Sequence, residues 1–127
     1  MGRIKNSMKA NIPLVGLDPV APDKSWEYGL SLSTVAFLAK SLSDENRLRV
    51  LLSLREGRLS VSSLVEALQL SQPLISHHLK ELKRSLLVKV ERHGPFIYYE
   101  LADKRILQII KDLESVAGDL LANRRTF

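Results

Sequence analysis

The 127-residue sequence contains no cysteine, which excludes disulfides, thiolate metal sites and thiol-based redox switches. Aromatic residues make up only 6% of the chain, too few for a surface that stacks the bases of single-stranded nucleic acid. No apolar run is long enough to span a bilayer, and the N-terminus has no signal-peptide pattern. We therefore expect a cytoplasmic protein that does not contact a membrane.

The sequence also lacks the residue constellations typical of an enzyme or a metal site. It has no Gly-rich phosphate loop and no histidine paired with a plausible nucleophile. His77 and His78 are adjacent, and adjacent helical residues point about 100° apart, so the pair cannot readily chelate one ion without another ligand. We expect no catalysis, no cofactor and no metal, with His77 facing outward and His78 making an orienting hydrogen bond beside the core.

The positive charge of the chain is concentrated in two segments. The net charge is +5, and residues 71–105 carry seven Lys and Arg against four Asp and Glu. Residues 1–24 carry four against two, whereas the remaining segments balance to zero. Such a local excess is the electrostatic pattern that phosphate binding requires.

The composition predicts one folded domain with an extension at each end. Hydrophobic residues make up 45% of the chain, enough for a single core. We expect a flexible arm at 1–25, because this segment lacks periodicity and contains three of the five prolines. The domain is expected at 26–121, followed by a short tail at 122–127.

Capping residues and apolar spacing predict three helices in the first half of the domain. The first has an apolar stripe, the second begins after the cap Asp44 and stops at Gly57, and the third begins after the cap Ser62. A turn at Gln69 and Leu70 then leads into a fourth helix, which makes a helix-turn-helix pair. The expected ranges are 31–42, 44–57 and 63–68 for the helices and 58–61 for a short extended piece.

The fourth helix, which we call the reading helix, begins after the cap Ser71. Its residues Ile75, Leu79, Leu82 and Leu86 recur at intervals of four, three and four, which predicts one buried face. Proline is tolerated in the first turn of a helix. The opposite face is expected to meet base edges and phosphates, through Gln72, Pro73, Ser76, His77, Lys80, Lys83 and Arg84.

Two β-rich runs separated by His93-Gly94-Pro95 predict a hairpin after the reading helix, at 87–92 and 96–101. Arg92 and His93 lie at its tip, where we expect them to reach the minor groove or its phosphates. A last helix follows from Asp103 to about residue 121, with an apolar surface too broad for so small a domain to cover.

The segments LSDENRLRVLLSL (42–54) and LSVSSLVEALQLSQPLISHHLKELKRSLLVKVERHGPFIYYEL (59–101) resemble the ArsR/SmtB family of bacterial winged-helix repressors. The resemblance implies a mainly α fold with a small β-hairpin wing, a winged helix-turn-helix. It also implies a homodimer on a palindromic operator in double-stranded DNA. The first and last helices would form the dimer interface, through Leu32, Val35, Leu38, Ile106, Ile109, Ile110, Leu113, Val116 and Leu120.

The chain departs from this family at two points. Many members have Gly in the helix-turn-helix turn, where this chain has Gln69. Metal-sensing members use cysteines, or Asp, His and Glu on the terminal helices, and the last helix here has carboxylates but no histidine. We therefore expect an organic small molecule, a partner protein or no effector at all. The alternative function is a winged-helix protein-interaction module with weak or no DNA binding.

Overall fold

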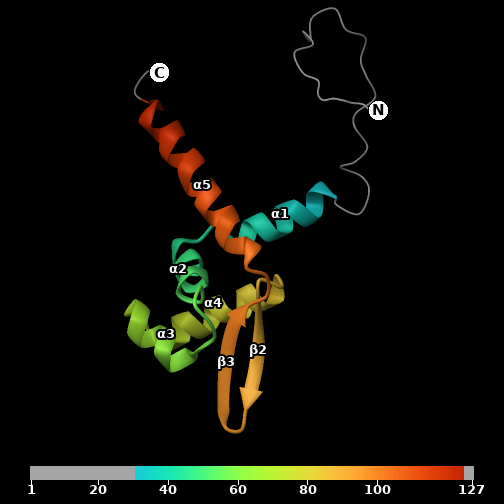
Figure 1. Ribbon diagram of the computed structural model, residues 1–127, viewed down its shortest axis with the longest axis vertical. Coiled ribbons are helices and arrows are strands. Elements are labelled where there is room, and N and C mark those ends of the chain that lie inside the picture. The colour runs from blue at the N-terminus through green and yellow to red at the C-terminus, as the bar shows by residue number, and fades with distance from the viewer. Residues whose placement is uncertain (1–30, 125–127) are drawn as a thin grey trace, which may run out of the picture. The chain divides into compact units, whose positions relative to one another are not determined.

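The computed structural model describes residues 31–124, so the expected arm at 1–25 and the last three residues lie outside the described part of the chain. Within it the fold is mainly α with a small antiparallel sheet, which confirms the expected fold class (Figure 1). The elements in chain order are α1 (Leu32–Ser41), α2 (Glu45–Ser53), β1 (Leu59–Ser60), α3 (Val61–Leu68), α4 (Gln72–Arg84), β2 (Val88–His93), β3 (Phe96–Leu101) and α5 (Arg105–Ala122).

The sheet has three strands in the order β1-β3-β2, one more than the expected hairpin. Strands β2 and β3 pair from Val88 opposite Leu101 to His93 opposite Phe96. Gly94 has φ +63° in the intervening turn, a left-handed conformation that glycine adopts without strain. The short piece that we expected at 58–61 pairs with the outer edge of β3 and so ties the wing to the helices.

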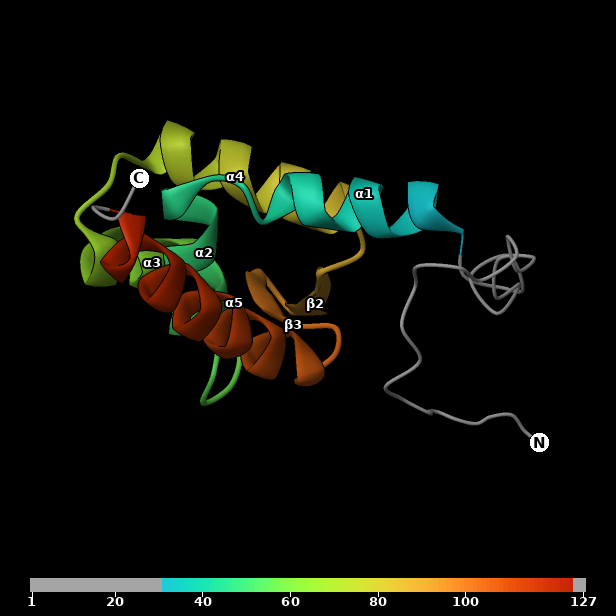
Figure 2. The same ribbon diagram turned by 90° about the horizontal axis from the view of Figure 1, so that it is seen from above.

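The core lies where α2, α3 and α4 meet the base of the sheet and the first turns of α5 (Figure 2). Ile75, Leu79 and Leu82 of α4 are buried, as the spacing predicts. They pack in one cluster with buried residues of the other elements: Leu42, Val50, Leu51, Leu54, Leu64, Leu68, Leu87, Val88, Leu101, Ile106 and Ile110.

Two predicted helix boundaries are wrong. Helix α2 ends at Ser53 rather than Gly57, because the amide groups that follow bond three residues back, as in Leu54 N–H to the carbonyl of Leu51 at 3.1 Å. Helix α3 is capped by Ser60 rather than Ser62, since the Ser60 hydroxyl accepts the Ser63 N–H at 3.1 Å. The predicted caps Asp44 and Ser71 are confirmed, accepting the N–H groups of Arg47 and Leu74.

The helix-turn-helix turn passes through a left-handed residue. Gln69 has φ 57° and ψ 40°, and its N–H bonds to the carbonyl of Val65 at 2.9 Å. The Arg49 guanidinium donates to the carbonyl of Leu68 at 3.0 Å, so α2 fixes the end of α3 just before the turn. Gln69 therefore adopts the conformation for which glycine is favoured.

Leu86 was expected on the buried face of the reading helix, and this expectation is wrong. Helix α4 ends at Arg84, and Leu86 follows with φ +67° and a side chain that is 78% exposed. Its N–H bonds to the carbonyl of Lys83, and the N–H of Leu87 reaches the carbonyl of Leu82 at 2.9 Å. These two bonds form a Schellman motif, whose left-handed position is usually glycine. A leucine there carries a strain of roughly 1–2 kcal/mol.

We expect Gln69→Gly to be more stable than Gln69→Ala by about 1 kcal/mol, because only glycine enters the left-handed region without a Cβ clash. Urea denaturation of the two variants at neutral pH measures the difference. Equal midpoints for the two variants would contradict a left-handed turn at this position.

Candidate nucleic-acid interface

Helix α4 separates its buried and polar residues into two faces. Gln72, Ser76, Lys80 and Lys83 follow one another at helical spacing on the exposed side, opposite the residues that enter the core. Pro73 and His77 are exposed beside them. The structure therefore brings the predicted base-reading and phosphate-contacting residues of α4 onto one accessible surface, which we call the α4 face.

The basic side chains of α4 differ in whether they form ion pairs within the protein. Within the described residues Lys80 and Lys83 form no ion pair. Arg84, at the end of the helix, donates to both oxygens of Glu81, with a shortest distance of 2.7 Å. This hydrogen bond lowers the pKa of the Glu81 carboxyl. Arg84 is thus engaged by a carboxylate of its own helix, whereas the ammonium groups of the two lysines are not paired with a carboxylate of the described chain.

The wing is fixed by a cluster around Arg58 that sequence reasoning missed. Nη1 of Arg58 donates to Oε1 of Glu91 at 3.0 Å and to Nε2 of His93 at 2.6 Å. Its guanidinium also lies 4.7 Å from the centre of the Tyr98 ring, a cation–π contact. The hydrogen bond from Arg58 lowers the pKa of the Glu91 carboxyl. Since β1 follows Arg58 directly, the cluster joins the wing to the helical body.

The predicted tip residues have different surroundings. Arg92 is exposed and has no ion pair among the residues described. His93 is exposed but accepts from Arg58, so its ring is held against the cluster. Tyr99 packs against the core while Tyr98 faces Arg58, as the alternation of strand side chains predicts.

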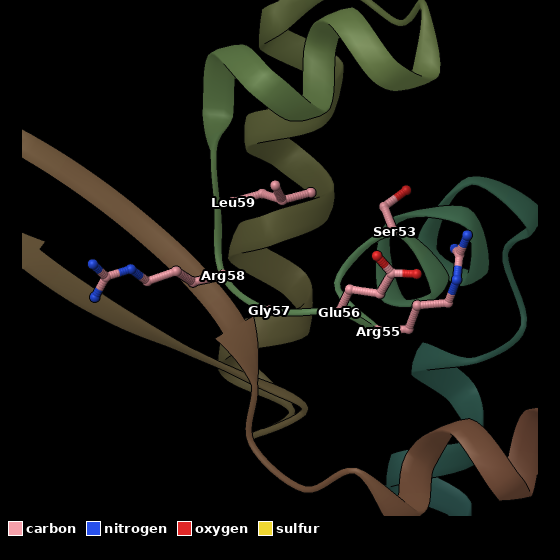
Figure 3. A pocket seen from close by; sticks show the side chains of 6 residues that line it. All are labelled: Ser53, Arg55, Glu56, Gly57, Arg58 and Leu59. Atoms are coloured by element: carbon pink, nitrogen blue, oxygen red, sulfur yellow. The ribbon is translucent and has the colours of Figure 1, made fainter.

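A shallow hollow lies beside the turn between α2 and β1, and Figure 3 shows how its side chains lie. Its volume is about 200 Å³, and Ser53, Arg55 and Glu56 line one side. Arg58 points away from them, toward the strands. With Arg58 held in the wing cluster, the charged side chains left at the hollow are Arg55 and Glu56, which have opposite signs.

His78 is the one buried imidazole of the described chain, and its surroundings differ from those expected. It is 4% exposed, and neither ring nitrogen has a hydrogen-bond partner. The nearest carboxylate is Asp44, with Oδ1 3.9 Å from Nε2. The expected orienting hydrogen bond is therefore absent. Burial lowers the pKa of His78. The positive charges of Arg47 and His77 lower it further, whereas the nearby carboxylate of Asp44 raises it.

The terminal helices expose much of the apolar surface that the sequence assigns to a partner. Val35 of α1 is exposed, and so are Ile109, Leu113, Val116 and Leu120 of α5, which we call the α5 stripe. Leu32 is also exposed and Leu38 is half-buried. Ile106 and Ile110 are only 6% and 8% exposed and belong to the core, so they offer a partner much less surface than the α5 stripe does. Four further exposed apolar residues of the described chain, Phe37, Leu52, Leu86 and Phe96, were assigned to no site from the sequence.

Across residues 31–124, no three His, Asp or Glu side chains gather in a way that could hold a metal ion. Asp103 forms an ion pair with Arg105, whose guanidinium lies 2.8 Å from Oδ2. Hydrogen bonds from Arg105 lower the pKa of the Asp103 carboxyl to about 2. In the same part of the chain, every helix is too short or too polar to cross a membrane.

The α3–turn–α4 unit with the β2–β3 wing beside it defines the class of winged helix-turn-helix proteins. Residues 44–90 match the sequence profile of the arsR family of bacterial regulatory proteins. The chain is 39% identical over 88 residues to the HTH-type transcriptional repressor SmtB of Mycobacterium tuberculosis, covering 69% of this chain and 65% of that protein. It thus spans just under two thirds of that relative's length.

Other relatives are covered more fully. The arsenical resistance operon repressor of Staphylococcus aureus is 34% identical, with 68% of this chain and 84% of that protein aligned. The structure of the regulator HlyU from Vibrio vulnificus superposes with a TM-score of 0.61 at 34% identity, covering 73% of this chain and 95% of that one. The chain therefore belongs to the ArsR family, and these relatives are transcriptional regulators rather than enzymes, as expected.

A further neighbour bears on assembly. The homodimeric winged helix-turn-helix DNA-binding domain of a possible ArsR-family regulator from Mycobacterium bovis superposes with a TM-score of 0.63 at 25% identity. The alignment covers 81% of this chain and 92% of that domain.

We expect the free energy of unfolding to fall as the pH drops below 6.5, the ordinary pKa of histidine. The unfolded chain takes up a proton there that the folded His78 resists, so this contribution is complete above pH 6.5 and is lost below it. His78→Leu should remove this effect. The slope of the free energy of unfolding against pH should then fall by up to about 1.4 kcal/mol per pH unit. Urea denaturation between about pH 7.5 and about pH 5.5 measures the slope.

His77→Gln is the matched control, since His77 is the exposed neighbour on the same helix. This variant should keep the wild-type pH dependence of stability. A His78→Leu protein with an unchanged slope would show that another group causes the effect.

Proposed function

We propose that this chain is a transcriptional repressor that binds a palindromic site in double-stranded DNA as a homodimer. The observation that carries the proposal is the α4 face, a row of free polar and basic side chains opposite a buried apolar row. A helix of this kind enters the major groove in helix-turn-helix proteins, and its first residues contact base edges. The family of the chain supports the same function.

Roles on the α4 face follow from position and chemistry. Gln72 occupies the first turn of α4, and its amide can pair with two atoms of an adenine edge. Ser76 lies one turn later on the same side. Lys80 and Lys83 contact phosphates, because free ammonium groups near the duplex release counterions on binding. Arg92 on the wing reaches the adjacent backbone, with the wing orientation set by Arg58.

Two reasons support dimerisation. The α5 stripe exposes four large apolar side chains in a row on one helix, a surface that a partner would remove from water. A two-fold dimer also doubles the few base contacts of one reading helix, and its symmetry is that of a palindromic site. The homodimeric state of the M. bovis relative is consistent with this assembly.

The effector is proposed to be an organic molecule with an apolar body. A pocket of about 600 Å³ lies between α2 and α5, lined by Leu48, Leu52, Leu107 and Leu113 among others. This volume is typical of small-molecule sites. Arg55, Lys111 and Glu114 also line it, and none of them has an ion pair among the described residues; two cations against one carboxylate favour a ligand with a negative group.

We expect Gln72→Ala to weaken binding to the specific site by about 1–3 kcal/mol and to relax base preference, because it removes a base-edge contact. Lys83→Ala should weaken binding to all duplexes alike and reduce the salt slope by about one, because it removes one phosphate contact. Fluorescence anisotropy with a selected operator and a scrambled duplex, over a range of salt, measures both.

Glu66→Ala provides a control, since Glu66 is exposed on α3 and outside the α4 face. It should keep the base preference of the wild type. If neither Gln72→Ala nor Lys83→Ala changes binding to any duplex, the assignment of the α4 face fails. Absence of any salt-dependent duplex binding by the wild type would favour a protein-interaction module instead.

We expect zinc and a chelator to leave operator binding unchanged, and anilinonaphthalene sulfonate, an aromatic anion, to bind the pocket between α2 and α5. Leu52→Trp fills part of this pocket from α2 and should weaken dye binding severalfold while operator binding stays intact. Dye fluorescence and operator anisotropy on the same samples measure the two effects. Stoichiometric zinc that releases the operator would contradict an organic effector.

A further inference from the structure

Leu86 combines two unfavourable features in one residue. Its backbone is left-handed at a position where glycine is the usual residue, and its side chain is 78% exposed to water. The Schellman motif needs only the backbone conformation, so it explains neither the size nor the apolar nature of the side chain. A large apolar side chain held in a strained and exposed position points to a contact outside the protomer.

The Leu86 side chain lines an apolar groove of about 410 Å³, which we call the Leu86 groove. The groove is walled by α1 through Leu38 and by α5 through Ile106 and Ile109. Ile109 is also the first residue of the α5 stripe. The groove is therefore continuous with the exposed apolar surface that the proposed dimer would cover.

The polar residues at the groove are already paired within the protomer. Asp103 and Arg105 form an ion pair at 2.8 Å, and Gln108 donates to Asp112 at 2.8 Å. The groove thus offers no free charge to a charged ligand, unlike the pocket between α2 and α5. An apolar centre with a satisfied polar rim is the composition of a protein–protein interface.

We propose that Leu86 is an anchor of the homodimer, with the Leu86 groove receiving apolar side chains of a second copy of this chain. The proposal rests on the dimer proposed above and adds the turn between α4 and β2 to an interface otherwise made of α1 and α5. Because this turn directly follows the reading helix, the contact couples the partner to the end of α4. The strained leucine is then explained by the surface that it buries on association.

The test compares Leu86→Gly with Gln69→Gly, which are matched because each replaces a left-handed residue by glycine. Leu86→Gly keeps the turn, so the variant should fold, as far-UV circular dichroism can verify. Sedimentation velocity over a range of concentrations should show its dimer dissociation constant raised by about 100-fold or more, because the dimer loses one buried leucine from each of its two protomers. Gln69→Gly should dimerise like the wild type.

Each alternative has its own signature. A Leu86→Gly protein that dimerises as tightly as Gln69→Gly would overturn the anchor and leave the dimer intact. A wild type that stays monomeric at all concentrations would overturn the dimer, and the anchor with it. Native mass spectrometry that finds a small apolar molecule on wild-type monomers, lost in Leu86→Gly, would assign the groove to a ligand and overturn the proposal.

Discussion

The burial of one face of α4 is the constraint on which the other features depend. Ile75, Leu79 and Leu82 are almost completely removed from water, and their packing against α2 and α3 fixes the rotation of the helix. Because a helix repeats every 3.6 residues, this rotation alone decides that Gln72, Ser76, Lys80 and Lys83 face outward. The orientation of the row proposed to read DNA is therefore set by buried leucines and an isoleucine on the opposite side of the helix. At the C-terminal end of α4, Leu82 and Leu87 extend the same packing into the sheet.

The sequence predicts best what local chemistry and periodicity determine. The buried row of α4, the caps Asp44 and Ser71 and the strand pairing on both sides of Gly94 need only near neighbours, and each is confirmed. The cap of α3 was misplaced because Ser60, Ser62 and Ser63 are equally good caps by composition. The choice among them depends on β1, which pairs with a strand nearly forty residues away.

Long-range and backbone effects account for the remaining errors. Leu86 fits the apolar spacing of α4 perfectly, so periodicity cannot reveal that the helix has already ended and that the residue is left-handed. The Arg58 cluster joins residues 33 and 35 positions apart, and no local pattern signals it. The burial of Ile106 and Ile110 in the protomer core is equally hidden from periodicity, because the apolar side chains of a helix in a small domain can face either the core or a partner. Only the packing shows which of them turn toward the core.

Helix α5 has two adjacent apolar rows, one that faces the core and one that is exposed. Ile106 and Ile110 are one turn apart and buried, whereas Ile109 and Leu113, three residues further along from each, are exposed. The row that anchors α5 to the core is thus adjacent to the row available to a partner.

The pocket between α2 and α5 and the Leu86 groove lie along the two sides of helix α5. Both are lined by residues of α5, but they share no residue. A ligand that shifts α5 against α2 would consequently change the Leu86 groove, and with it the geometry of any dimer that the groove supports. In the proposed dimer, α5 would therefore link the proposed effector pocket to the spacing of the two reading helices without a metal or a thiol.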